Sequence, residues 1–113
     1  MVKVHVVRDK TGFIWELKVE GHAEAGEFGK DIVCAAVSVI AQTGLGALEE
    51  IAGISKKKFI IKPGFIKFSV PLDISQDKKN TVKIILETAV IGFKQIEFTP
   101  EYSRYISVLD EEV

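Results

Sequence analysis

The chain has 113 residues, a formal net charge of -1 at pH 7 and a hydrophobic fraction of 47%. This length suits one domain with a single core, and the hydrophobic fraction excludes a disordered chain. The balanced charge gives no general electrostatic attraction for nucleic acid or anionic lipid. The single cysteine, Cys34, excludes an intramolecular disulfide. Residues 1–113 lack both a signal-peptide pattern and the roughly 18 unbroken apolar residues of a membrane span, which predicts a soluble cytoplasmic domain.

Period-two alternation predicts two strands at the start of the chain. Valines alternate with polar residues from Val2 to Val6, and apolar side chains alternate again from Phe13 to Val19. The segment between them, 9–12, contains Asp and Gly and suits a tight reversal, so we expect an antiparallel hairpin. The glycine-rich segment that follows predicts a mobile loop.

A long apolar run at 32–52 predicts the first helix. Asp31 is a favoured N-cap residue, and Gly53 is a favoured residue just past a helix end. The first half of the run is apolar nearly all round, so we expect it to be covered on more than one side. Gly44 and Gly46 either weaken the helix or mark close packing.

Two further strands and a second helix are expected next. The strands, at 58–62 and 65–70, flank Pro63-Gly64, a pair that favours a type II turn. Ser75 is a suitable N-cap for an amphipathic helix whose apolar spacing extends to Phe93. The chain therefore repeats the order of two strands followed by a helix.

The last part of the chain predicts two short strands, at 95–98 and 104–108, and a frayed tail at 110–112. The complete order is ββα-ββα-ββ. Such an order favours a single α+β domain with a mainly antiparallel or mixed sheet and two helices.

The side chains able to do covalent chemistry are few, and two of them flank the predicted loop. If Asp31 caps the helix, Cys34 is its third residue, where backbone N–H groups and the helix dipole favour a thiolate. His22 ends the second strand, and the loop is long enough to bring the helix start back beside it. A cysteine with a histidine base is the minimum for nucleophilic acyl transfer.

Plainer roles fit the same residues. A lone cysteine in an apolar helix is usually a small buried side chain, and a histidine beside a glycine is usually a solvated loop residue. Asp31 is more often only a cap, although it could orient His22. Ser38, one turn beyond Cys34, could simply bond back to helix carbonyls. One cysteine and two histidines cannot supply closed four-fold zinc ligation without carboxylates, which show no recognisable spacing, so a zinc site is disfavoured. The cysteine and histidine chemistry needs no metal or organic cofactor.

The glycine-rich segment leads to a hypothesis about substrate access. Residues 23–30 include Gly26 and Gly29 and offer little to bury, which gives the backbone freedom. Together with Gly21, these glycines define a predicted substrate-gating loop. Its closure over a bound substrate would bring His22 and Cys34 together.

An ordered string of residues around this segment closely resembles the signature of the ribosomal-processing cysteine protease family, Prp. The string is Gly21-His22-Ala23, Gly26, Gly29 and Asp31-Ile32-Val33-Cys34-Ala35-Ala36-Val37-Ser38. Segments 41–43 and 48–50 are also similar, and the element order fits along nearly the whole chain.

The resemblance implies a bacterial endopeptidase that removes a short N-terminal extension from a large-subunit ribosomal protein, cutting after an aromatic residue. It implies Cys34 as the nucleophile and His22 as the general base, with Asp31 and Ser38 on signature positions of less certain role. It also implies a homodimer. No membrane or direct nucleic-acid partner is expected.

Two other functions stay open on the sequence alone. A non-enzymatic, ribosome-associated peptide-binding or assembly protein would use the glycine loop to hold a peptide and Cys34 as a structural residue. A redox sensor would use an activated thiol. Cleavage of a ribosomal precursor that is lost in Cys34→Ala separates the protease from both.

Overall fold

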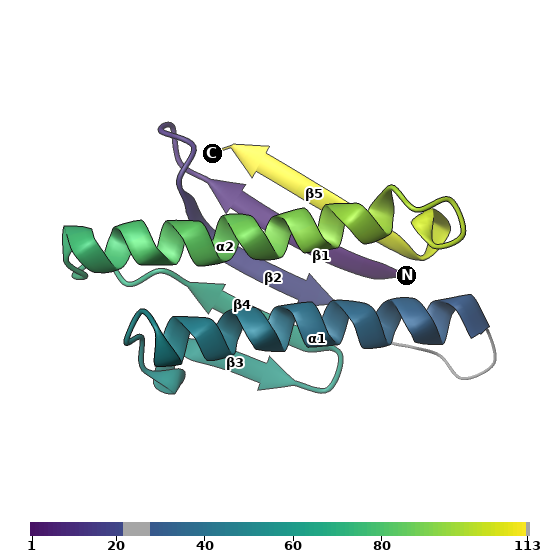
Figure 1. The fold of residues 1–113 in the computed structure, drawn as a ribbon, viewed down its shortest axis with the longest axis horizontal. Coiled ribbons are helices and arrows are strands. Elements are labelled where there is room, and N and C mark those ends of the chain that lie inside the picture. The colour runs from purple at the N-terminus through teal and green to yellow at the C-terminus, as the bar shows by residue number, and fades with distance from the viewer. Residues whose placement is uncertain (22–27, 113) are drawn as a thin grey trace.

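A five-stranded mixed sheet forms one layer of the molecule (Figure 1). The computed structural model describes residues 1–21 and 28–112, and side chains from residue 32 onward in the second segment. The strands are β1 (Val2–Arg8), β2 (Ile14–Glu20), β3 (Phe59–Lys62), β4 (Phe65–Ser69) and β5 (Ile106–Glu112). Their order across the sheet is β3-β4-β2-β1-β5. β1 and β5 run parallel, whereas the other neighbours are antiparallel.

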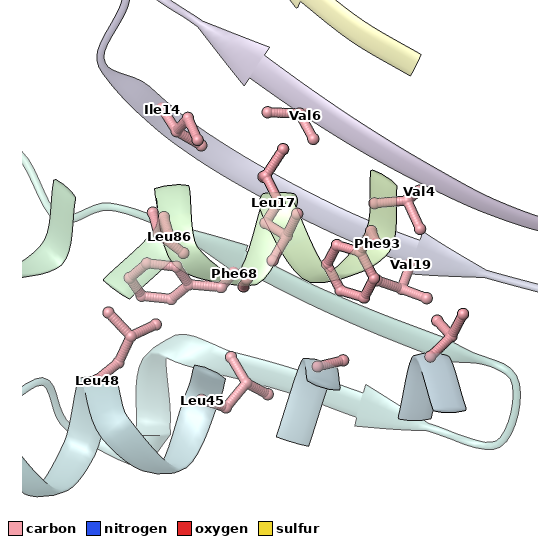
Figure 2. Packing of buried hydrophobic residues seen from close by; sticks show 14 of the residues in the cluster. Val4, Val6, Ile14, Leu17, Val19, Leu45, Leu48, Phe68, Leu86 and Phe93 are labelled. Atoms are coloured by element: carbon pink, nitrogen blue, oxygen red, sulfur yellow. The ribbon is translucent and has the colours of Figure 1, made fainter. Parts of the chain in front are cut away.

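Two helices, α1 (Phe28–Glu50) and α2 (Gln76–Glu97), lie side by side over one face of this sheet (Figure 1). Two short 3₁₀ turns, η1 (Lys56–Lys58) and η2 (Ser103–Tyr105), precede β3 and β5. Figure 2 shows apolar side chains from both layers meeting in the core, among them Val4, Val6, Leu17, Phe68, Leu45, Leu48, Leu86 and Phe93. The predicted α+β fold with a mixed sheet and two helices is therefore confirmed.

The two predicted hairpins are confirmed as β1–β2 and β3–β4. In the first turn the Asp9 carboxylate accepts hydrogen bonds from the backbone N–H groups of Thr11, at 2.8 Å, and Phe13, at 3.1 Å. In the second, Gly64 has a φ of 70°, the left-handed conformation that the type II turn requires after proline. Both hairpins are thus encoded by residues adjacent in sequence.

The ends of the helices agree only partly with the sequence prediction. Ser75 caps α2 as expected, because its hydroxyl accepts from the Lys78 backbone N–H at 3.2 Å. Gly53, with φ 70°, follows α1, and the Ile54 N–H donates to the Leu48 carbonyl at 2.9 Å, which closes the helix end. The predicted start of α1 is wrong, because the helix begins at Phe28.

Asp31 therefore lies inside α1 and is not its N-cap residue. The prediction failed because it took the first good capping residue as the start of the helix. Gly29 does not prevent an earlier start, since a glycine inside a helix costs only about 1 kcal/mol. The predicted loop at 23–30 is likewise wrong for 28–30, which are helical, while 22–27 lie outside the described residues.

As expected, α1 is covered on more than one side, by the sheet and by α2, although part of its surface stays exposed. Val33 and Val37 are buried against the core, whereas Val39 is 65% exposed. The helix continues without interruption through Gly44, where an added Cβ would lie 3.6 Å from the Ala89 Cβ of α2. Gly44 therefore marks close helix packing rather than a break.

The stretch Ile32–Glu50 within α1 is long and apolar enough to span a membrane by length and composition. Several of its apolar residues face the core, including Ala41, Leu45 and Leu48. Packing in the folded domain thus accounts for part of its hydropathy.

The end of the chain differs from the prediction. Residues 95–97 continue α2 and Phe98 is its C-cap, so the predicted strand at 95–98 is wrong. Four residues are too few for an alternating pattern to be told from a helix. One final strand, β5, forms instead of two, and it begins and ends later than the predicted 104–108.

The tail at 110–112 belongs to β5 and is not frayed, because it pairs with β1. The Asp110 carboxylate also lies 2.7 Å from Arg8 Nε and 3.0 Å from Lys94 Nζ. Arg8 belongs to β1 and Lys94 to α2. Asp110 therefore ties the last strand to both the sheet and the helix layer.

Candidate active site

Cys34 lies on the flank of α1, half-buried at the rim of the core. Its neighbours Val33 and Val37 are at most 2% exposed, and their burial fixes the rotation of the helix. Residues spaced by four lie on one helix face, so Cys34, Ser38 and Gln42 follow one another along α1. All three line the same pocket, whose volume is about 440 Å³.

The rest of this pocket is supplied by the sheet. Val2, Val19 and Ile66 line it with apolar side chains. The β3–β4 hairpin contributes Ile61, and Lys62 is the charged residue among the described residues that line the pocket. The pocket therefore combines a sulfur, two polar side chains of α1 and a mainly apolar lining.

Gly21 follows β2 at the pocket and has a φ of 123°, a conformation that L side chains rarely adopt. A Cβ at this position would collide with the carbonyl oxygen of Met1. Its N–H donates to the Gly64 carbonyl at 3.0 Å, which ties the end of β2 to the β3–β4 turn. Only glycine fits here, so the chain leaves the pocket in a defined position immediately before His22.

The remaining predicted site residues meet different outcomes. His22 and Gly26 lie outside the described residues, and so does the side chain of Asp31. Gly29 is helical rather than part of a loop. The contact between the predicted base and nucleophile thus stays a prediction.

Cys34 is the seventh residue of α1 rather than the third, because the helix begins at Phe28. The helix dipole acts mainly within the first turn. The start of the helix therefore does not explain how the Cys34 thiol would be activated. A neighbouring base is the main candidate for that role.

Ser38 and Gln42 are joined by a hydrogen bond of 2.8 Å from Gln42 Nε2 to Ser38 Oγ. Ser38 was predicted as a supporting residue, but the sequence reasoning assigned no role to Gln42. The spacing from Cys34 by multiples of four could have identified it. Ile61 was missed because its position opposite α1 depends on the fold.

His5, the other histidine, is not part of this pocket. Its Nε2 lies 3.0 Å from Glu20 Oε1, so it is a partner of Glu20. Lys3 pairs with Glu20 across β1 and β2, and such alternate positions face away from the core. Within the described part of the chain, no group of three or more His, Cys, Asp or Glu could hold a metal ion.

The family model described as cysteine protease Prp matches residues 1–107. The chain belongs to the Prp family. The ribosomal processing cysteine protease Prp of Staphylococcus aureus strain Mu50 is 26% identical over 106 residues, which cover 94% of this chain and 95% of that protein. The chain is thus a cysteine protease of the Prp family.

Solved Prp structures share the fold. A crystal structure of Prp from S. aureus with a substrate peptide has a TM-score of 0.78 and 23% identity, covering 98% of this chain and 100% of that one. A second, with a covalently linked product peptide, has a TM-score of 0.72 and 25% identity over the same shares. The Prp fold therefore spans essentially the whole chain.

Proposed function

We propose that this Prp-family protease removes the N-terminal extension of a large-subunit ribosomal protein, with Cys34 as nucleophile and His22 as general base. The observation that carries the proposal is the position of the only cysteine, which lies half-buried in a pocket of about 440 Å³. A cysteine protease with one cysteine has one thiol to serve as nucleophile. The peptide complexes of the S. aureus relative support a peptide substrate.

The reaction follows from the chemistry of the two side chains. His22 takes the thiol proton, and Cys34 Sγ forms a bond to the scissile carbonyl carbon. When the C–N bond breaks, His22 returns the proton to the leaving amine, and a thioester remains on Cys34. Water, deprotonated by His22, then adds to the thioester and releases the peptide carboxylate and the thiol.

The pocket lining supports cleavage after an aromatic residue. Val2, Val19 and Ile66 offer apolar surface beside Cys34. An aromatic side chain buries about 150–250 Å² and gains most from such a lining. A basic side chain at the same position would lose hydration without a carboxylate among the described lining residues to pair with.

A second copy of the chain is the proposed partner of the exposed helix surface. A groove of about 580 Å³ between α1 and α2 is lined by uncharged residues among those described, including Val39 and Ile96. Val39 is 65% exposed and Ile91, on α2, is 58% exposed. Pairing of this surface between two copies would cover the side of α1 that the monomer leaves exposed.

Incubation of the enzyme with the host's ribosomal precursor tests the proposal, with the products identified by mass spectrometry. We expect a single cut near the precursor's N-terminus that is absent in Cys34→Ala. An uncut precursor held in a stable complex would instead support the peptide-binding protein. Because ribosomal proteins are made and assembled in the cytoplasm, we place the enzyme there.

A further inference from the structure

We infer that the substrate groove continues along α1 beyond Cys34, so that Gln42 holds the main chain of the peptide and Ile61 supports one of its apolar side chains. This inference deepens the proposed function and rests on it. It assigns to Gln42 and Ile61 the binding of substrate residues that are remote from the scissile bond.

The length of the groove follows from the helix. Cys34 and Gln42 are eight residues apart on α1, and both line the pocket. At 1.5 Å per residue the helix rises roughly 12 Å between them. An extended peptide advances about 3.3 Å per residue. Gln42 therefore lies beside the substrate roughly three to four residues from the bond that Cys34 attacks.

The amide of Gln42 suits a peptide group. A glutamine side chain has two N–H donors and a carbonyl acceptor. One donor bonds to Ser38 Oγ at 2.8 Å, and the structure gives this amide no other hydrogen bond within the described residues. The second donor and the acceptor match the C=O and N–H of an extended main chain. The bond to Ser38 holds the amide in place before the peptide arrives.

Ile61 lies across the groove on the edge strand β3 and is 60% exposed. It pairs with Ile66, which also lines the pocket, whereas its neighbour Ile60 pairs with Lys67. Because side chains alternate along a strand, Ile61 faces the groove and Ile60 faces the opposite side of the sheet. A substrate side chain packed on Ile61 would remove its exposed apolar surface from water.

A helix-surface role for Gln42 is the alternative. Hydrogen-bonded pairs at this spacing stabilise helices slightly without any ligand. The chain offers a matched control on α2, where Gln76 Nε2 donates to Asn80 Oδ1, also at 2.8 Å and four residues apart. Gln76 does not line the pocket of Cys34. The same substitution at both glutamines thus separates substrate binding from helix stability.

The test measures kcat and KM for cleavage of synthetic peptides that span the processing site of the host's ribosomal precursor. It also measures calorimetric binding of the same peptides to the Cys34→Ala enzyme. We expect Gln42→Leu to weaken binding roughly three- to tenfold, the range of one hydrogen bond, and to raise KM with kcat little changed. Gln76→Leu should bind as wild type. Ile61→Ser should weaken binding, and Ile60→Ser should not.

Truncation of the peptides supplies the positional test. The loss caused by Gln42→Leu should vanish once one side of the scissile bond keeps fewer than three residues. A loss that persists in the shortest peptides, or a Gln42→Leu enzyme that matches Gln76→Leu, would overturn the inference while cleavage itself stands. An enzyme that binds peptides through Gln42 but cuts none would instead overturn only the proposed function.

Discussion

Arg8 on β1 and Asp110 on β5 face each other through two hydrogen bonds, 2.7 Å from Nε to Oδ1 and 3.2 Å from Nη2 to Oδ2. The guanidinium also bonds to Glu87 of α2 at 2.7 and 3.0 Å. One arginine therefore links the last strand, the first strand and the second helix. This network helps to hold residues 110–112, which the composition predicts to be frayed, in the sheet.

The hydrogen bond from Arg8, followed by the bond from Lys94, holds the pKa of Asp110 below its ordinary value. Because the pKa of Asp110 is lower in the folded state, its ionised form stabilises the protein at pH values above the unfolded-state pKa of about 3.8. This stability is lost as the pH falls through the folded-state pKa. We expect Asp110→Asn to cost about 0.5–1 kcal/mol at pH 7 in urea denaturation and little near pH 2. Glu112→Gln, on the same strand, is the control. An equal loss at both pH values would contradict the ionic explanation.

His22 and Cys34 should behave as one catalytic unit. Each alanine variant is expected to reduce cleavage at least roughly a thousandfold, and the double variant should be little worse than Cys34→Ala, because residues that act together are not additive. The measurement is kcat/KM on the ribosomal precursor. Full activity of His22→Ala would remove the histidine from the mechanism.

The pH profile of thiol alkylation tests how Cys34 is activated. Because Cys34 lies beyond the first turn of α1, the helix dipole contributes little and His22 should supply the activation. We expect the iodoacetamide rate to titrate below about 8.5 in the wild type and close to it in His22→Ala. An identical midpoint in both proteins would show that another group activates the thiol.

Gly21 and Gly46 predict opposite effects of the same substitution. Gly21→Ala should cost about 1–3 kcal/mol and lower activity, because its φ of 123° is strained for alanine and the Cβ collides with Met1. Gly46→Ala should stabilise α1 by about 0.5–1 kcal/mol, because no heavy atom lies within 4 Å of the added Cβ. Thermal unfolding checks both, and a stable, active Gly21→Ala would contradict the role of Gly21.

The proposed homodimer should dissociate when a charge is placed in the groove between the helices. Val39→Glu should dissociate the dimer in sedimentation velocity, since an unpaired charge is costly in an apolar interface. Ile51→Glu is the control, because Ile51 is 71% exposed but does not line the groove. If both variants sediment like the wild type, the interface lies elsewhere or the chain is monomeric.

The sequence by itself determined the features that depend on neighbouring residues. Alternating valines predicted the β1–β2 hairpin, and Pro63-Gly64 predicted the turn between β3 and β4. Ser75 predicted the start of α2 through its side-chain cap. The single cysteine and the ordered string around it identified the family and the nucleophile candidate. Periodicity, turns and caps are local, so they can be read along the chain.

Only the tertiary structure decided which distant residues meet. The parallel pairing of β5 with β1 brings Asp110 to Arg8, although 102 positions separate them in the chain. The collision that requires glycine at Gly21 comes from Met1, and the groove of Cys34 has its second wall on the β3–β4 hairpin. These relationships follow from strand order and helix rotation. Both are set by burial of the whole core, which no local pattern contains.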